Sequence, residues 1–136
     1  MKLLFCHDGP IAVDKEGNVY HTTFNEEVLS RYFTIADEMT YVTRTKLIDP
    51  NNYNIPKLNV KGFKVVRTPN LSSLKGILLD RRKAKDIIKT EMEKCDYVIA
   101  RLPSLIGDMA IDLAKIHNKP YLVEMVACPW DAYWNH

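Results

Sequence analysis

The chain has 136 residues, and 46% of them are hydrophobic, which is enough for the core of one domain and leaves little room for a second. Its 19 Lys and Arg residues nearly balance its 17 Asp and Glu residues, so the net charge gives no reason to expect binding to nucleic acid. No apolar run approaches the roughly 20 residues that span a bilayer, and three dispersed cysteines argue against a disulfide framework. We therefore expect a soluble, cytoplasmic domain.

The chain begins with the patterns of a buried strand and a small hairpin. Residues 2–6 are an apolar run that stops at a tight turn. A hairpin is predicted for residues 11–13 and 19–20, where Gly17 and Asn18 can supply positive φ in the connecting turn.

A helix is predicted from about residue 24 to residue 36, because its apolar side chains recur at helical spacing. Thr23 and Glu26 have the spacing of a capping box that would start this helix. A strand is expected over residues 40–45, since they are mostly β-branched or aromatic. Residues 46–59 are rich in Asn and Pro and predict a long loop, of the kind that is often functional or mobile.

The second half of the chain alternates predicted strands with predicted helices. In order these are a strand at 63–67, a helix at 74–94, a strand at 96–101, a helix that Ser104 starts and Asn118 stops, and a strand at 121–126. Strand–helix–strand units require parallel pairing with right-handed crossovers. The sequence therefore predicts an α/β fold, with a mainly parallel sheet covered by helices.

Polar and aromatic side chains follow the expected strands. They are His7, Asp8 and Gly9 after the first, Arg44 and Lys46 after the second, Arg67 and Asn70 after the third, Arg101 and Ser104 after the fourth, and Glu124, Trp130 and Asp131 on and after the fifth. In open parallel sheets, ligands bind beyond the carboxyl ends of the strands. We therefore expect these side chains to gather at one edge of the sheet.

Two interpretations stay open for several of these residues. Arg101 and the first amides after Ser104 suit a phosphate or a sugar hydroxyl, but Arg101 can equally pair with a local carboxylate while Ser104 only caps its helix. His7 and Asp8 suit a general base and its orienter. Neighbours on a strand point to opposite faces, however, so an ordinary strand-end histidine is slightly favoured.

The last eight residues hold two Trp and one Tyr around Asp131. Aromatic faces beside a carboxylate suit sugar rings, whereas the other interpretation is a packing surface for a following domain. On the 74–94 helix, a solvated face is favoured over contact with a membrane surface for the basic group Arg81, Arg82, Lys83 and Lys85. No metal-ligand spacing, dinucleotide fingerprint or phosphate loop is present, so we expect neither a metal nor a cofactor.

Five blocks of the sequence together resemble bacterial GT-B glycosyltransferases, most closely the retaining enzymes that build capsule, O-antigen or other exopolysaccharide. The blocks are residues 7–10 (HDGP), 14–20 (DKEGNVY), 101–104 (RLPS), 119–124 (KPYLVE) and 129–136 (PWDAYWNH). The resemblance covers residues 1–136 but only the N-terminal half of such an enzyme. It implies a Rossmann-like three-layer αβα domain that holds the acceptor, while a C-terminal domain absent from this chain holds the sugar nucleotide. Enzymes of this type need no metal.

The resemblance also implies roles for individual residues. We expect substrate contacts from Gly9, Arg101, Ser104, Glu124 and Trp130, and we place Asp131 where many relatives carry a histidine near the transferred sugar. The expected function is the acceptor-binding half of a retaining glycosyltransferase, inactive alone, with a sugar or lipid-linked saccharide as acceptor. One alternative is a standalone, non-catalytic domain that docks on a donor-binding subunit or on the inner face of the membrane. Another is a small α/β protein that binds a nucleotide or flavin.

Overall fold

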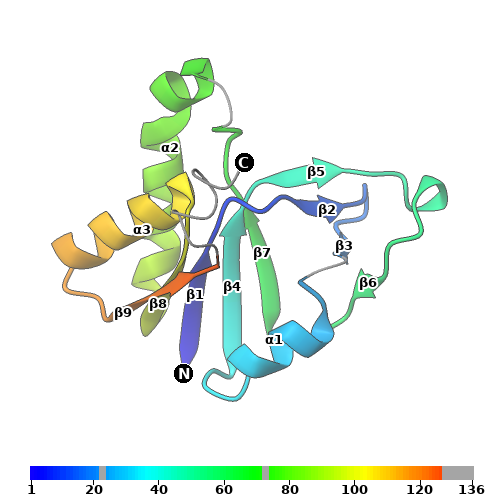
Figure 1. Cartoon of the computed structure of the whole chain (residues 1–136), viewed down its shortest axis with the longest axis horizontal. Coiled ribbons are helices and arrows are strands. Elements are labelled where there is room, and N and C mark those ends of the chain that lie inside the picture. The colour runs from blue at the N-terminus through cyan, green and yellow to red at the C-terminus, as the bar shows by residue number, and fades with distance from the viewer. Residues whose placement is uncertain (22–23, 72–73, 127–136) are drawn as a thin grey trace, which may run out of the picture.

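The computed structural model describes residues 1–21, 24–71 and 74–126, and its centre is a five-stranded sheet (Figure 1). In chain order the strands are β1 (Lys2–Cys6), β4 (Glu38–Thr43), β7 (Phe63–Arg67), β8 (Tyr97–Leu102) and β9 (Tyr121–Met125). They are hydrogen-bonded in the order β7-β4-β1-β8-β9, and each neighbouring pair is parallel. The chain therefore moves outward from β1 in one direction and then in the other. This is the Rossmann-like order, and its switch point lies between β1 and β8.

Helices cover both faces of this sheet (Figure 1). The helices are α1 (Glu26–Tyr32) on one face, and α2 (Leu74–Glu93) and α3 (Leu105–Ile116) on the other. Successive residues of β1 supply the two cores in turn, because strand side chains alternate between faces. Leu3 and Phe5 pack with α1, whereas Leu4 and Cys6 pack with α2 and α3. The predicted α/β fold with three layers is confirmed.

A second, smaller sheet lies beside α1 (Figure 1). Its strands, in the order of pairing, are β5 (Thr45–Leu47), β2 (Ile11–Val13), β3 (Val19–Tyr20) and β6 (Lys57–Leu58). The predicted hairpin is confirmed, with β2 and β3 antiparallel and Gly17 at a φ of 85°. Asn18 plays a different part, because its amide group donates to the carboxylate of Asp14 at 2.8 Å.

The prediction of one long loop over residues 46–59 is wrong in part. That segment contains most of β5, a short 3-10 helix η1 (Pro50–Asn52) and β6. The two strands are only three and two residues long, too short to leave a period-two pattern in the sequence. They form because the hairpin offers them unpaired edges.

Helix α1 is shorter than predicted, and another residue caps it. The side chain of Asn25 accepts from the amide of Val28 at 3.0 Å, so the helix begins at Glu26 rather than at residue 24. Thr23, the predicted cap, lies outside the described residues. The helix ends at Tyr32, four residues early, where Thr34 turns its hydroxyl back to the carbonyl of Arg31.

Helices α2 and α3 occupy the expected ranges, and α3 buries its predicted apolar stripe except for Leu105, which is 42% exposed. In α2 the core contacts come from Ala84, Ile88 and Met92 in its second half. Leu74 and Leu78 were expected in the same stripe, yet they are 82% and 83% exposed. The first turns of α2 project beyond the sheet (Figure 1).

Candidate functional site

The loop after β1 is held on both sides by hydrogen bonds. The Asp8 carboxylate accepts from the amide of Leu105 at 2.6 Å, which ties the loop to the start of α3. On the other side, the Arg44 guanidinium donates to the Asp8 carbonyl at 2.8 and 3.0 Å. The Thr43 hydroxyl donates to the Gly9 carbonyl at 2.7 Å. The ends of β1 and β4 and the start of α3 therefore form one connected region, as the strand-end argument predicts.

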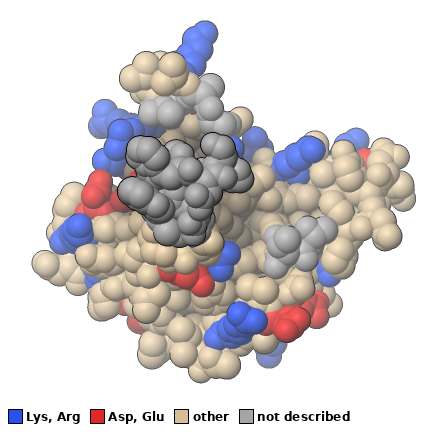
Figure 2. All heavy atoms as spheres, viewed as in Figure 1, with Lys and Arg blue, Asp and Glu red and all other residues tan. Residues whose placement is uncertain are grey.

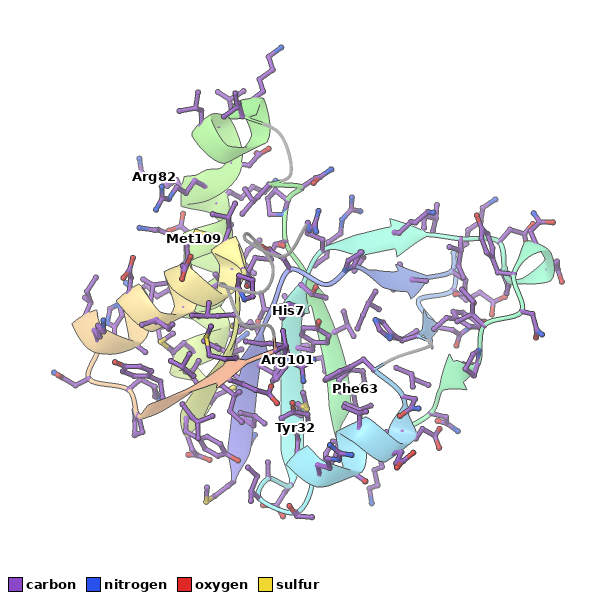
Figure 3. The ribbon with its side chains drawn as sticks, viewed as in Figure 1. His7, Tyr32, Phe63, Arg82, Arg101 and Met109 are labelled. Carbon is purple, nitrogen blue, oxygen red and sulfur yellow. The ribbon has the colours of Figure 1, made fainter. Side chains whose placement is uncertain are left out.

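Arg101 on β8 is held in a network that crosses from the sheet to α1 (Figure 3). It donates from Nε to Glu124 at 2.9 Å and from Nη2 to the Tyr32 hydroxyl at 2.7 Å. That hydroxyl in turn donates to Glu124 at 2.8 Å. The guanidinium carbon also lies 5.1 and 5.3 Å from the ring centroids of Phe5 and Phe24, within cation–π range. Of the two interpretations, pairing with a local carboxylate is the one observed.

The same network shifts the pKa values of its members. Burial opposes ionisation of Glu124, but the hydrogen bonds from Arg101 and Tyr32 outweigh it and hold the pKa of Glu124 below its usual value. Burial and the neighbouring carboxylate raise the pKa of Tyr32 to about 12. The pair is therefore ionised and the phenol neutral at neutral pH, which fixes the direction of each hydrogen bond.

A hollow of about 290 Å³ opens beside Arg101, and we call it the His7 hollow. It is lined by His7, Gly9, His21, Phe24, Val28, Arg31, Tyr41 and Arg101. Burial and the charge of Arg101 lower the pKa of both histidines, so both imidazoles are neutral at pH 7. The Nδ1 atom of His7 is buried and has no hydrogen-bond partner in the described part of the chain.

Gly9 is a glycine because the His7 ring lies against it. A Cβ atom at this position would stand 2.9 Å from Cδ2 of His7, closer than real contacts allow. A larger residue would displace the imidazole from the hollow. Gly9 thus shapes the hollow whether or not its backbone touches a ligand.

A second hollow, of about 270 Å³, lies at the carboxyl ends of β4 and β7, and we call it the Arg67 hollow. Its lining is Pro10, Arg44, Thr45, Lys46, Arg67, Thr68 and Asn70. Sequence reasoning placed most of these residues at strand ends but assigned them no role. The two hollows adjoin, because the consecutive residues Gly9 and Pro10 line one each.

The structure brings some of the predicted site residues together and separates others. Gly9 and Arg101 line the His7 hollow, and Glu124 lies directly behind Arg101. Ser104 is 8% exposed and caps α3 by accepting from the amide of Gly107 at 2.7 Å, and it lines neither hollow. Trp130 and Asp131 lie outside the described residues, so their roles stay predictions, as does substrate contact by the others.

Several residues of the site were not found by sequence reasoning. Tyr32 occupies a core position in the stripe of α1, and nothing in its spacing distinguishes a phenol that reaches Glu124 from one that only packs. His21 precedes α1 and Arg31 lies in its last turn, and neither belongs to a recognisable motif. No group of three metal-ligating side chains forms among residues 1–21, 24–71 and 74–126.

The fold defines a Rossmann-like α/β domain with two hollows at the carboxyl edge of its central sheet. Over 140 aligned residues, the chain is 35% identical to Protein CapJ of Staphylococcus aureus. The alignment covers 100% of this chain and 34% of CapJ, so the chain spans about a third of the length of that relative. No family profile matches the chain, and no solved structure matches it. Within the described ranges, no helix is long and apolar enough to cross a membrane.

Proposed function

We propose that this chain is the acceptor-binding part of a sugar-nucleotide-dependent retaining glycosyltransferase that acts in capsule synthesis. The observation that carries the proposal is the His7 hollow, which opens at the carboxyl edge of a Rossmann-like sheet beside its switch point. The similarity to CapJ, whose name indicates capsule, supports the biological process. The resemblance to GT-B enzymes described above supports the reaction type.

The lining of the His7 hollow suits a saccharide. Arg31 and Arg101 present guanidinium donors to hydroxyl oxygens, and neutral His7 can exchange hydrogen bonds with hydroxyls without carrying charge. Aromatic side chains complete the wall, and sugar C–H groups pack well against such rings. We place the acceptor sugar here, with Glu124 holding Arg101 in position rather than touching the ligand.

We further propose that the donor nucleotide binds elsewhere in the complete enzyme and that this chain alone does not turn over. The chain matches only 34% of CapJ, which leaves room for a donor-binding domain in a protein of that length. Trp130 and Asp131 are proposed to face the transferred sugar, without metal or cofactor. The alternative of a nucleotide or flavin protein is weakened by the absence of a phosphate loop from the sequence.

Titration of this chain by ¹H–¹⁵N NMR tests the proposal. The probes are glucose, N-acetylglucosamine and glucuronate as saccharides, and UDP-glucose as the donor type. At least one saccharide is expected to shift the amides of Gly9 and Phe24, and Arg31→Gln is expected to weaken that response. The matched control is Lys115→Gln, an exposed charge on α3. Tighter binding of UDP-glucose than of every saccharide, or equal responses of the two variants, would contradict an acceptor site here.

A contact with the membrane is a second candidate function, and one observation favours it. The projecting end of α2 exposes Leu74, Leu78 and Leu79 at 82%, 83% and 72%. After Asp80 come the basic residues Arg81, Arg82, Lys83 and Lys85, and Figure 2 shows Lys and Arg side chains along this part of the molecule. Exposed leucines beside cations are what a helix needs to lie in an anionic lipid interface. Such a contact would bring the site close to a lipid-linked acceptor at the cytoplasmic side.

Vesicle sedimentation distinguishes a membrane contact through α2 from a helix face that is only solvated. We expect binding to phosphatidylcholine vesicles that contain phosphatidylglycerol, and none to vesicles of phosphatidylcholine alone. Leu78→Ser is expected to reduce binding, whereas Leu122→Ser, at a 56% exposed leucine on β9, is expected to leave it unchanged. Equal loss in both variants, or no binding to either vesicle, would refute the contact.

A further inference from the structure

The Arg67 hollow gathers positive charge without any acidic residue in its lining. Arg44, Lys46 and Arg67 line it, and its other residues are uncharged. Like charges in one small space repel one another unless an anion offsets them. Some basic residues elsewhere in the described part of the chain do have acidic partners. Lys64 pairs with Glu91, for example, at 3.3 Å.

Each of the three cations can be followed to its contacts within the described residues. Arg44 donates to a carbonyl oxygen of the β1 loop and meets no carboxylate. The Lys46 ammonium lies 5.9 Å from the ring centroid of Tyr53. Arg67 forms no hydrogen bond or ion pair through its side chain with the described part of the chain. Lys46 and Arg67 therefore line the hollow without an ionic partner among the described residues, and Arg44 is held by the backbone.

A buried hydroxyl at the same place is the second, independent observation. Thr68 is 2% exposed, and its Oγ1 has no hydrogen-bond partner among the described residues. Most buried side-chain polar atoms have a partner, since leaving one without costs free energy. Thr68 also lines the Arg67 hollow, where its hydroxyl can donate to an oxyanion. Three basic residues and a residue with a buried, unpartnered hydroxyl thus line one space.

We propose that the Arg67 hollow binds a phosphoryl group, with Arg67 and Lys46 as its charge partners and Thr68 as a hydroxyl donor. The position of the two hollows along the sheet edge indicates which part of a larger ligand this phosphoryl group would be. Because Gly9 and Pro10 join the two hollows, a saccharide in the His7 hollow and a phosphoryl group in the Arg67 hollow can belong to one molecule. A lipid-linked saccharide, whose sugar is attached through diphosphate, has this form. That last identification rests on the proposed function, whereas the anion site does not.

Isothermal titration of this chain with inorganic pyrophosphate tests the anion site. We expect saturable binding that weakens as NaCl rises, and a loss of at least tenfold in affinity in Arg67→Gln. Lys46→Gln provides a second variant, and Lys115→Gln removes the same charge far from the hollow as a control. All three sites are exposed, so none of the variants is expected to unfold. If pyrophosphate binds only adventitiously to surface charge, Arg67→Gln and Lys115→Gln will have equal affinity for it. That result would overturn the proposal of an anion site in the Arg67 hollow.

Two further ligands identify the source of the phosphoryl group. Farnesyl diphosphate stands for a lipid diphosphate and UDP-glucose for a nucleotide donor. Tighter binding of farnesyl diphosphate than of pyrophosphate, abolished in Arg67→Gln, supports the lipid-linked acceptor. Tighter binding of UDP-glucose through Arg67 would assign the hollow to a donor and overturn that identification. If saccharides fail to bind the His7 hollow while pyrophosphate binds here, the proposed function fails and the anion site stands.

Discussion

The two hollows lie side by side at one edge of the sheet, yet their charges are balanced in different ways. In the His7 hollow, Arg101 is paired with Glu124 and held by Tyr32, and the histidines are neutral, so Arg31 is the one cation in its lining without an acidic partner among the described residues. In the Arg67 hollow, three basic residues lie in a lining that holds no acidic side chain among the described residues. The fold explains why both hollows are at this edge, but it does not explain what each one can bind. That depends on which side chains the register sets opposite one another.

The register of the sheet produces the difference. Arg101 on β8 stands directly opposite Glu124 on β9, so the ion pair follows from strand pairing. Arg67 on β7 stands opposite Thr43 on β4, and β7 has no neighbour on its other side in the described sheet. Arg101 stands opposite an acidic residue on the next strand, so its charge is neutralised within the fold. Arg67 lies on an edge strand without such a partner in the described sheet, so its charge is available to a ligand.

The largest expected effect tests whether Arg101 is part of the scaffold. Arg101→Met keeps much of the side-chain volume over the Phe5 and Phe24 rings but leaves Glu124 partly buried without its cation. We expect the free energy of unfolding to fall by about 2–3 kcal/mol in urea denaturation followed by circular dichroism. The matched change Arg67→Met is expected to stay within about 0.5 kcal/mol of the parent chain.

A double variant shows whether the loss comes from the orphaned carboxylate. Glu124→Gln added to Arg101→Met removes the uncompensated charge and is expected to recover part of the stability, so that the two changes are not additive. Equal effects of Arg101→Met and Arg67→Met would mean that the two arginines do not differ in the way the structure indicates.

A smaller loss is expected from Ser104, which was predicted from sequence as a substrate contact. Ser104→Ala removes the hydroxyl that accepts from the amide of Gly107 at 2.7 Å, and should cost about 1 kcal/mol of unfolding free energy. Ser30→Ala, at an exposed serine within α1, should cost less than about 0.5 kcal/mol. Pyrophosphate affinity should be unchanged in both. A large drop in affinity for Ser104→Ala would instead make the start of α3 part of the anion site.

The pH dependence of stability distinguishes the hollows further, because only the His7 hollow contains histidines. Folding lowers the pKa of His7 and His21, so below about pH 6.5 the unfolded chain binds more protons than the folded one. Their contribution to stability is therefore present above that pH and is lost as the pH falls. His7→Asn should flatten the decline in unfolding free energy between pH 7.5 and pH 5, leaving the part due to His21. An equal flattening by His117→Asn, at an exposed position after α3, would contradict this assignment.

Much of this edge could be predicted from the sequence. The five long strands leave apolar runs, and the rule for parallel sheets then places His7, Gly9 and Arg101 near one another. The rest depends on contacts between distant residues. Neither the reach of Tyr32 to Glu124 nor the pairing of β5 with β2 leaves a local signal, since each requires the fold to exist first. The burial of Leu74 and Leu78 was predicted wrongly. An apolar stripe shows which side of a helix is apolar, but it does not show how far along the helix the sheet extends to cover that side.

The smallest expected effect concerns two buried threonines. One has a hydrogen-bond partner within the described part of the chain and the other has none, as Arg101 and Arg67 do in the two hollows. Thr43 and Thr68 are 0% and 2% exposed, but the Thr43 hydroxyl donates to the Gly9 carbonyl at 2.7 Å, whereas that of Thr68 has no partner in the described part of the chain. Thr43→Val should cost about 1–2 kcal/mol of unfolding free energy, because it leaves the buried Gly9 carbonyl with only the longer hydrogen bond from the Tyr41 hydroxyl at 3.4 Å.

Thr68→Val should change stability by no more than about 0.5 kcal/mol, or raise it slightly, because no hydrogen bond is broken. Its effect should appear in binding instead, as weaker pyrophosphate affinity measured by calorimetry on the same samples. Equal destabilisation by the two substitutions would mean that Thr68 has a structural partner after all. If Thr68→Val leaves the unfolding free energy unchanged but weakens pyrophosphate binding, the buried hydroxyl contributes to ligand binding. It would then be a hydrogen-bond donor to the anion that the folded chain does not need for its stability.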